Sequence, residues 1–197
     1  NAAAHSSLSL LDSRAGRYEA ALGHARAAAS AQPDEAVYHY NLGHLLARLG
    51  RDEQALESLH RAVKLDVGYA PAFNELGNVY LHLDRPAEAE EALLAGLRAD
   101  PRLAPLHKNF ARAALARGRI DDALRSLEDA LALGPGDFQS TAEIHYWLAV
   151  AHSRAQRPGV ACRHLEELRR MDPAGIGPWA AEAAVLARQL SCAGGFS

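Results

Sequence analysis

Residues 70–103 read APAFNELGNVYLHLDRPAEAEEALLAGLRADPRL, and this stretch decides the fold. Its Asn-Glu-Leu-Gly at 74–77 has counterparts 34 residues to either side, at 40–43 and 108–111. A third counterpart follows after another 38 residues, at 146–149. Segments that match in register along the chain predict a structural repeat of about 34 residues.

Glycine or alanine recurs at two places of the repeat. One series stands in the segments just described, at Gly43, Gly77, Ala111 and Ala149. The other stands in the second half of each repeat, at Ala21, Ala55, Ala89, Ala123 and Ala161. Small side chains at matching places allow two paired helices to approach closely, which offsets the cost of about 1 kcal/mol for a glycine inside a helix.

The ends of the helices are marked as well. Glycine takes a positive φ cheaply, so we expect the first helix of a repeat to stop at Gly16, Gly50 and Gly118. Proline lacks an N–H and clashes with the preceding turn, so we expect the second helix to stop near Pro33, Pro101, Pro135 and Pro173.

The composition agrees with a helical protein. Alanine occupies 42 of the 197 positions and leucine 29, whereas Val, Ile and Thr together occupy 11. Alanine and leucine are strong helix formers, and strands favour β-branched residues, so a sheet protein is excluded.

With these marks, the sequence resembles the tetratricopeptide repeat (TPR) family, whose signature is carried most completely by Phe73, Leu76, Gly77, Tyr80, Ala89, Leu93 and Pro101. The resemblance implies an all-α fold of helix-turn-helix repeats stacked into a right-handed superhelical solenoid. We expect five TPR units over residues 2–175, at about 2–35, 36–69, 70–103, 104–141 and 142–175. A C-terminal capping helix at 176–193 and a tail at 194–197 complete the expected organisation.

Charge and motifs exclude several functions. The 21 Lys and Arg against 24 Asp and Glu leave no basic excess for nucleic acid, and no uncharged run reaches the roughly 18–20 residues of a membrane span. No nucleotide-binding loop, nucleophile elbow or zinc-protease motif is present, so we expect no catalytic residue and no cofactor. The ten histidines fall on different helices or on packing positions, so we expect no metal site.

Two further features leave alternatives open. The favoured interpretation of Cys162 and Cys192 is two small buried hydrophobic residues, and the alternative is a disulfide that forms if the last helix packs back on the helix of Cys162. The chain does not begin with methionine, which indicates an N-terminal truncation, and both a cytoplasmic and a periplasmic location stay open.

One face of the first helices is the most informative surface for function. The second, fifth, sixth, ninth and thirteenth positions of a repeat share a helical stripe. Amides on this stripe can bind a peptide backbone, Arg and Lys can bind carboxylates, and aromatic rings can anchor a partner. We therefore predict a partner-binding groove formed by Tyr40, Asn41, His44, Arg48, Asn74, Asn78, His82, Lys108, Asn109, Arg112, Tyr146, Trp147 and Arg154.

The first repeat adds Ser6, Ser7, Leu10 and Arg14 to the same stripe, while Glu75 and Glu143 are its acidic members. The excess of basic residues favours a non-enzymatic scaffold that binds an extended or helical, mildly acidic peptide of a protein partner in the concave groove. A solvated face with hydrogen bonds between repeats is the simpler interpretation of these residues.

Two other functions stay open. The chain could be the substrate-docking segment of a larger enzyme, of the glycosyltransferase, sulfotransferase or hydroxylase type. It could also be a self-assembling structural scaffold, because the alanine-rich C-terminal helix is apolar nearly all round and could form a homo-oligomer.

Overall fold

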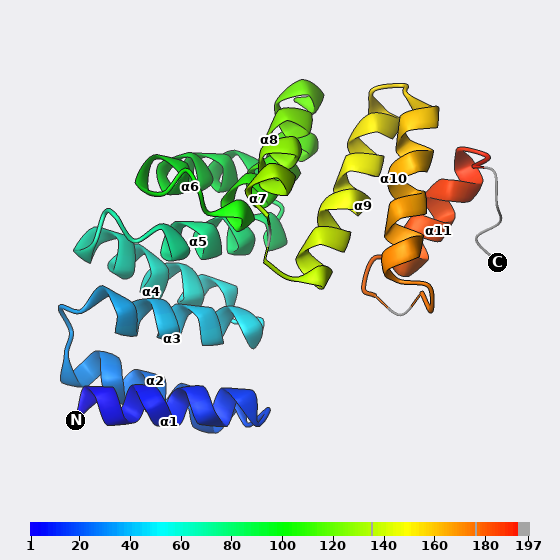
Figure 1. The fold of residues 1–197 in the computed structure, drawn as a ribbon. Coiled ribbons are helices and arrows are strands. Elements are labelled where there is room, and N and C mark those ends of the chain that lie inside the picture. The colour runs from blue at the N-terminus through cyan, green and yellow to red at the C-terminus, as the bar shows by residue number, and fades with distance from the viewer. Residues whose placement is uncertain (135, 176, 193–197) are drawn as a thin grey trace. The chain divides into compact units, whose positions relative to one another are not determined.

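The computed structural model describes residues 1–134, 136–175 and 177–192, apart from the side chain of Phe138, and all regular elements of this part are α-helices. The helices are labelled in Figure 1. The chain divides into two compact units, residues 1–101 and 102–197. Pro135 and the predicted tail at 194–197 lie outside the described residues.

Unit 1 consists of three antiparallel helix pairs (Figure 1). The pairs are α1 (Ala2–Arg14) with α2 (Tyr18–Ala31), α3 (Ala36–Arg48) with α4 (Asp52–Leu65), and α5 (Ala70–His82) with α6 (Pro86–Ala99). The second helix of one pair also packs against the first helix of the next, as stacking repeats require.

Unit 2 consists of two such pairs and one further helix. The pairs are α7 (Ala104–Ala116) with α8 (Ile120–Leu133) and α9 (Phe138–Arg154) with α10 (Pro158–Met171), and α11 (Ala180–Gln189) follows. Asp137 caps α9 by accepting a hydrogen bond from the backbone N–H of Ser140 at 2.7 Å. Because α9 begins at Phe138, the repeat boundary expected after residue 141 falls inside this helix.

The small residues of the second helices lie where the helices of a pair cross. All five members of that alanine series are fully buried, with 0% of their surface exposed. A Cβ added to Gly77 in α5 would lie 2.4 Å from Cγ of Leu93, and a Cβ added to Gly43 in α3 would lie 2.6 Å from Cγ of Leu59. The predicted packing role of these residues agrees with the structure, and the expected all-α fold of stacked helix pairs is confirmed.

In the first repeat different residues allow the two helices of the pair to pack closely. Ser9 stands where the later repeats carry glycine or alanine, and it is 5% exposed. Its hydroxyl donates a hydrogen bond of 3.0 Å to the backbone carbonyl of Ala21. The residue in α2 that corresponds to Leu59 and Leu93 is Ala25, whose smaller side chain leaves room for the serine.

The turns within the pairs follow one geometry with two kinds of residue. Gly16, Gly50 and Gly118 have positive φ angles of 74°, 68° and 75°, as the sequence predicts. At the corresponding positions Asp84 has a φ of 54° and Gln156 a φ of 59°. The left-handed turn is therefore kept in two repeats that lack the glycine, at a steric cost that glycine would avoid.

The C-terminal helix is tied to the preceding pair. Trp179, Ala183 and Ala187 pack into a small core with residues of α9 and α10. Cys162 of α10 and Cys192, which follows α11, form a disulfide with a Cα–Cα distance of 5.5 Å. The favoured interpretation of the two cysteines as unpaired hydrophobic residues was therefore wrong, because α11 packs back on α10 as the alternative required.

Candidate functional site

In unit 1 the structure brings together two residues of the predicted groove, Tyr40 and His44, both from α3. The ring of Tyr40 lies on edge against Tyr69 at 5.3 Å and is stacked with His44 at 6.1 Å. The Nδ1 atom of His44 lies 3.0 Å from Oε1 of Glu75 on α5. Burial, and then the nearby Glu75 and Tyr69, raise the pKa of Tyr40 to about 12, so its hydroxyl stays protonated. Asn41 points from α3 toward α1, where its Nδ2 lies 3.4 Å from the hydroxyl of Ser6.

The other predicted residues of unit 1 are more dispersed. Arg48 donates a hydrogen bond of 2.9 Å to the hydroxyl of Tyr18, and its guanidinium lies 5.0 Å from the centre of that ring. Asn74 and Asn78 are half-buried on α5, and His82 is exposed at the end of α5. Arg14, Arg48 and His82 occupy one repeat position at 34-residue intervals, at the ends of the three first helices.

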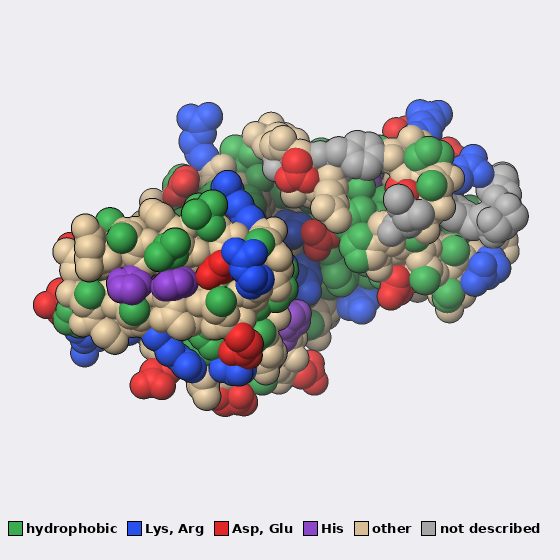
Figure 2. Space-filling model, turned by 90° about the horizontal axis from the view of Figure 1, so that it is seen from below, with side chains coloured by type: hydrophobic (Ala, Val, Ile, Leu, Met, Phe, Trp, Pro, Cys, Tyr) green, Lys and Arg blue, Asp and Glu red, His purple; other side chains and the backbone are tan. Residues whose placement is uncertain are grey.

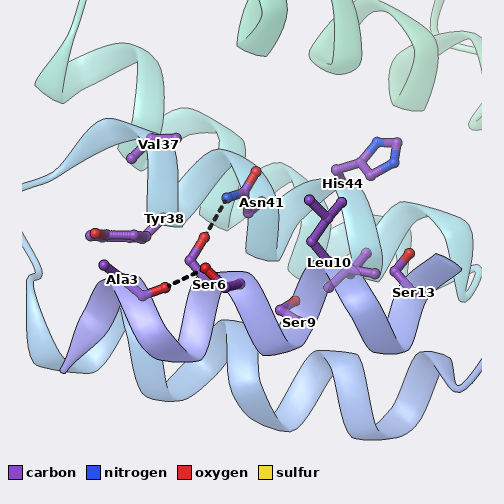
Figure 3. A pocket seen from close by; sticks show the side chains of 11 residues that line it. Ala3, Ser6, Ser9, Leu10, Ser13, Val37, Tyr38, Asn41 and His44 are labelled. Atoms are coloured by element: carbon purple, nitrogen blue, oxygen red, sulfur yellow. Dashed lines mark hydrogen bonds between the residues drawn. The ribbon is translucent and has the colours of Figure 1, made fainter. Parts of the chain in front are cut away.

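A cavity of about 490 Å³ lies between α1 and α3 (Figure 3). Most of its polar lining consists of hydroxyl and amide groups, and Leu10 and Val37 add apolar surface; the other lining residues include Ser6, Ser7, Ser9, Ser13, Tyr38, Asn41 and His44. Ser6 and Asn41 point toward one another in the lining of the cavity, as Figure 3 shows. These groups can donate to and accept from a polypeptide backbone without regard to its side chains.

Helix α1, at the N-terminal end of unit 1, carries exposed apolar residues in and beside this cavity. Leu8, Leu10 and Leu11 are 44%, 54% and 58% exposed. Figure 2 looks onto this end of unit 1, where hydrophobic side chains stand in small groups among polar ones.

In unit 2 the basic residues of the predicted groove bind other groups of the protein. Lys108 on α7 forms an ion pair with Glu143 on α9, with Nζ 2.7 Å from Oε2, and both side chains are largely buried. The guanidinium of Arg112 lies 5.4 Å from the centre of the Trp147 ring and donates a hydrogen bond of 3.1 Å to Oδ1 of Asn109. Burial lowers the pKa of Arg112, and the nearby Glu143 partly offsets that effect.

Burial also separates structural members of the predicted groove from accessible ones. Asn109 is 2% exposed and therefore belongs to the core of unit 2. Arg154 donates a hydrogen bond of 2.7 Å to the backbone carbonyl of Leu115, so it joins α9 to α7. Tyr146 and Trp147 remain partly exposed, with their rings on edge at 5.2 Å.

The sequence does not predict two residues that contact the groove from outside the stripe on the first helices. Tyr69 precedes α5, and Tyr18 begins α2, yet they contact Tyr40 and Arg48. The helical spacing could not find them because it compares only positions on the first helices. The two acidic residues of the stripe are the partners of His44 and Lys108.

The described residues contain no cluster of three or more His, Cys, Asp or Glu side chains placed to hold a metal ion. Within the same residues, no helix is both long enough and apolar enough to cross a membrane.

Sequence profiles described as tetratricopeptide repeat match residues 36–68, 70–103 and 108–176, which together make up more than half of the chain. The comparison with curated proteins gives no match.

Several solved structures share the fold at low sequence identity. A thermophilic TPR protein of Thermus thermophilus is 24% identical with a TM-score of 0.74, and the match covers 97% of this chain and 99% of that one. PilF of Pseudomonas aeruginosa is 19% identical with a TM-score of 0.81, covering 96% of this chain and 82% of that one. YrrB, described as a TPR protein with an unusual peptide-binding site, is 19% identical with a TM-score of 0.68, covering 93% of this chain and 91% of that one.

Proposed function

The chain belongs to the tetratricopeptide repeat family, and from this premise we propose that it is a non-enzymatic scaffold which binds an extended or helical, mildly acidic peptide segment of a partner protein. Repeat arrays of stacked helices present extended surfaces that suit protein partners. One of the similar structures is described as having a peptide-binding site.

The observation that carries this proposal is the cavity between α1 and α3. Its hydroxyl groups and the Asn41 amide offer hydrogen bonds to a peptide backbone, and Leu10 and Val37 offer contacts to apolar side chains. A volume of about 490 Å³ lies within the range of roughly 300–1,000 Å³ that is usual for binding pockets. The exposed leucines of α1 extend the apolar surface beyond the cavity.

The preference for acidic peptides rests on unit 1. Arg14 and Arg48 are exposed at the ends of α1 and α3, and His82 follows at the same repeat position of α5. Arg48 gives one N–H to Tyr18, and an arginine carries five N–H donors, so a carboxylate can be bound at the same time. In unit 2, by contrast, Lys108 already binds Glu143, and an acidic peptide would have to displace that carboxylate.

The test is selection from a random peptide library displayed on phage, with the full chain immobilised. We expect a class of binders enriched in Asp and Glu. Binding of synthetic peptides from this class should fall by roughly tenfold or more in the double variant Arg14→Glu and Arg48→Glu, since two attractive contacts become repulsive. Asn41→Ala should weaken it by a smaller factor.

Arg26→Glu together with Arg98→Glu is the matched control, because these two arginines are also exposed but lie on the second helices α2 and α6. This control should bind the acidic peptides as the native chain does. Equal losses in both charge reversals would show only a general effect of net charge, and selection without acidic enrichment would contradict the proposed preference.

A further inference from the structure

A furrow runs between α9 and α11 within unit 2 and consists of two adjoining cavities, which share Tyr146 and Glu182. The larger cavity, of about 620 Å³, is lined by polar and aromatic residues, among them Gln139, Glu143, Trp147 and Trp179. The smaller, of about 360 Å³, is lined mainly by apolar residues that include Val150, Val185 and Leu186. We call the two together the α9–α11 furrow.

The ionisable groups of the furrow are acidic. Asp137, Glu143 and Glu182 line the larger cavity, and no Lys, Arg or His lines either cavity in the described part of the chain. Lys108 neutralises Glu143, while Glu182 is exposed on α11. Burial, and then Glu182, raise the pKa of Tyr146 and outweigh the opposite effect of Arg154, so its hydroxyl stays protonated and the side chain uncharged.

The aromatic wall of the larger cavity suits a cation as well. Tyr146 and Trp147 stand side by side on α9 and are only partly covered. The faces of aromatic rings attract cations. The guanidinium of Arg112 already lies over Trp147, 5.4 Å from the ring centre, so the partly exposed Tyr146 ring is the one left to a cation of the ligand. Carboxylates and aromatic faces in one cavity form a complementary environment for a guanidinium or an ammonium group.

We propose that the α9–α11 furrow binds a peptide segment of a partner protein, with an arginine or lysine side chain in the larger cavity and an aliphatic side chain in the smaller one. Charge complementarity selects the basic residue, and Val150, Val185 and Leu186 select the aliphatic residue. The site is separate from the cavity between α1 and α3 and has the opposite charge preference. It rests on the proposed function only in that the occupant is a peptide.

Tryptophan fluorescence can report binding in the α9–α11 furrow. The chain has two tryptophans, Trp147 and Trp179, and both line the larger cavity. A peptide that enters this cavity should therefore change the tryptophan fluorescence, whereas a peptide held only between α1 and α3 should leave it unchanged. The same phage-displayed random library, panned on the full chain, supplies the peptides.

We expect a second class of binders that combines a basic with an aliphatic residue and shifts the tryptophan fluorescence. Glu182→Gln should weaken this class roughly fivefold or more, because it removes the exposed carboxylate. Glu128→Gln is the matched control, since it makes the same change at an exposed position of α8. Replacing the peptide's arginine or lysine with neutral citrulline or norleucine should cost about as much as Glu182→Gln.

Several results would overturn the proposal. Basic peptides that leave the fluorescence unchanged, or that bind the Glu182→Gln variant as well as the native chain, would place their site elsewhere. Selection that yields only acidic peptides, lost in the Arg14 and Arg48 double variant, would refute the furrow and leave the proposed function standing. Selection that yields basic peptides but no acidic ones would support the furrow and contradict the proposed preference for acidic peptides. A dimer in sedimentation that Val185→Glu dissociates would assign the furrow to a second copy of the chain.

Discussion

Gly77 offers the sharpest test of how the helices of a pair are packed. Replacing it with alanine places a Cβ 2.4 Å from Cγ, 2.5 Å from Cδ2 and 2.8 Å from Cδ1 of Leu93. The whole branch of the leucine is too close, and not only a flexible tip. Leu93 is fully buried, so it has no solvent-filled space to turn into.

The expected magnitude is the difference between two opposing effects. Alanine is favoured over glycine inside a helix by about 1 kcal/mol. Overpacking of a core typically costs about 1–3 kcal/mol, and contact with the branch atom Cγ places Gly77→Ala in the upper part of that range. We therefore expect the free energy of unfolding to fall by about 1–2 kcal/mol.

The control is Gly23→Ala in α2. A Cβ at Gly23 meets no heavy atom within 4 Å, and the residue is exposed. Only the helix preference then acts, and the free energy of unfolding should rise by up to about 1 kcal/mol. The same substitution should thus have opposite signs at two helical glycines of one unit.

Urea unfolding of the full chain, followed by circular dichroism, measures both variants. Leu93→Ala completes a double-mutant cycle with Gly77→Ala. Alone it should cost about 2–5 kcal/mol, and the two together should cost less than their sum, because the new methyl group occupies space that the leucine vacates. A Gly77→Ala variant as stable as the native chain, or strictly additive costs, would refute the close-approach argument.

Two further predictions concern the C-terminal unit. The disulfide spans 30 residues, so its reduction should lower the free energy of unfolding by about 3.6 kcal/mol by the loop-entropy relation. Hydrogen-exchange protection should fall selectively in α11. Unchanged protection would show that packing alone holds this helix. The second prediction concerns His164, whose pKa is lowered to about 4 by burial and then by His145 and His152. Between about pH 6.5 and pH 4 the unfolded chain therefore binds more protons at this residue than the folded chain does. The urea midpoint should therefore fall as the pH drops through this window, and by less in His164→Asn, whereas identical slopes would remove this histidine as a cause.

The register of the repeats could be predicted because the residues that define it have the same packing role in every repeat. The alanines of the second helices are small, periodic and buried for a reason that holds in every repeat. The turn positions of Asp84 and Gln156 could not be recognised by residue type, because the left-handed conformation is imposed there by the helices on either side. Ser9 departs from the repeat in the sequence, and its match with Ala25 emerges only when the two helices are paired.

The candidate sites were less predictable, since they depend on which side chains bind one another. A count of charges along the first helices gives a basic stripe. The structure pairs Lys108 with Glu143 and Arg154 with a backbone carbonyl, so these two bases join neighbouring helices. Arg14 and Arg48 remain at the surface of unit 1. Sequence position alone does not distinguish these two uses of a basic residue.

The contacts between successive first helices limit how a partner can bind. Asn41 reaches Ser6, His44 reaches Glu75, and Lys108 reaches Glu143, each across one repeat. The charged contact at 2.7 Å between largely buried side chains is costly to break, because a separated buried charge loses its compensation. The contact of 3.4 Å between Asn41 and Ser6 is long for a hydrogen bond, and a peptide backbone can replace it with little loss. We therefore expect a partner to bind first at the cavity between α1 and α3, where the contact between successive first helices is the easiest to replace.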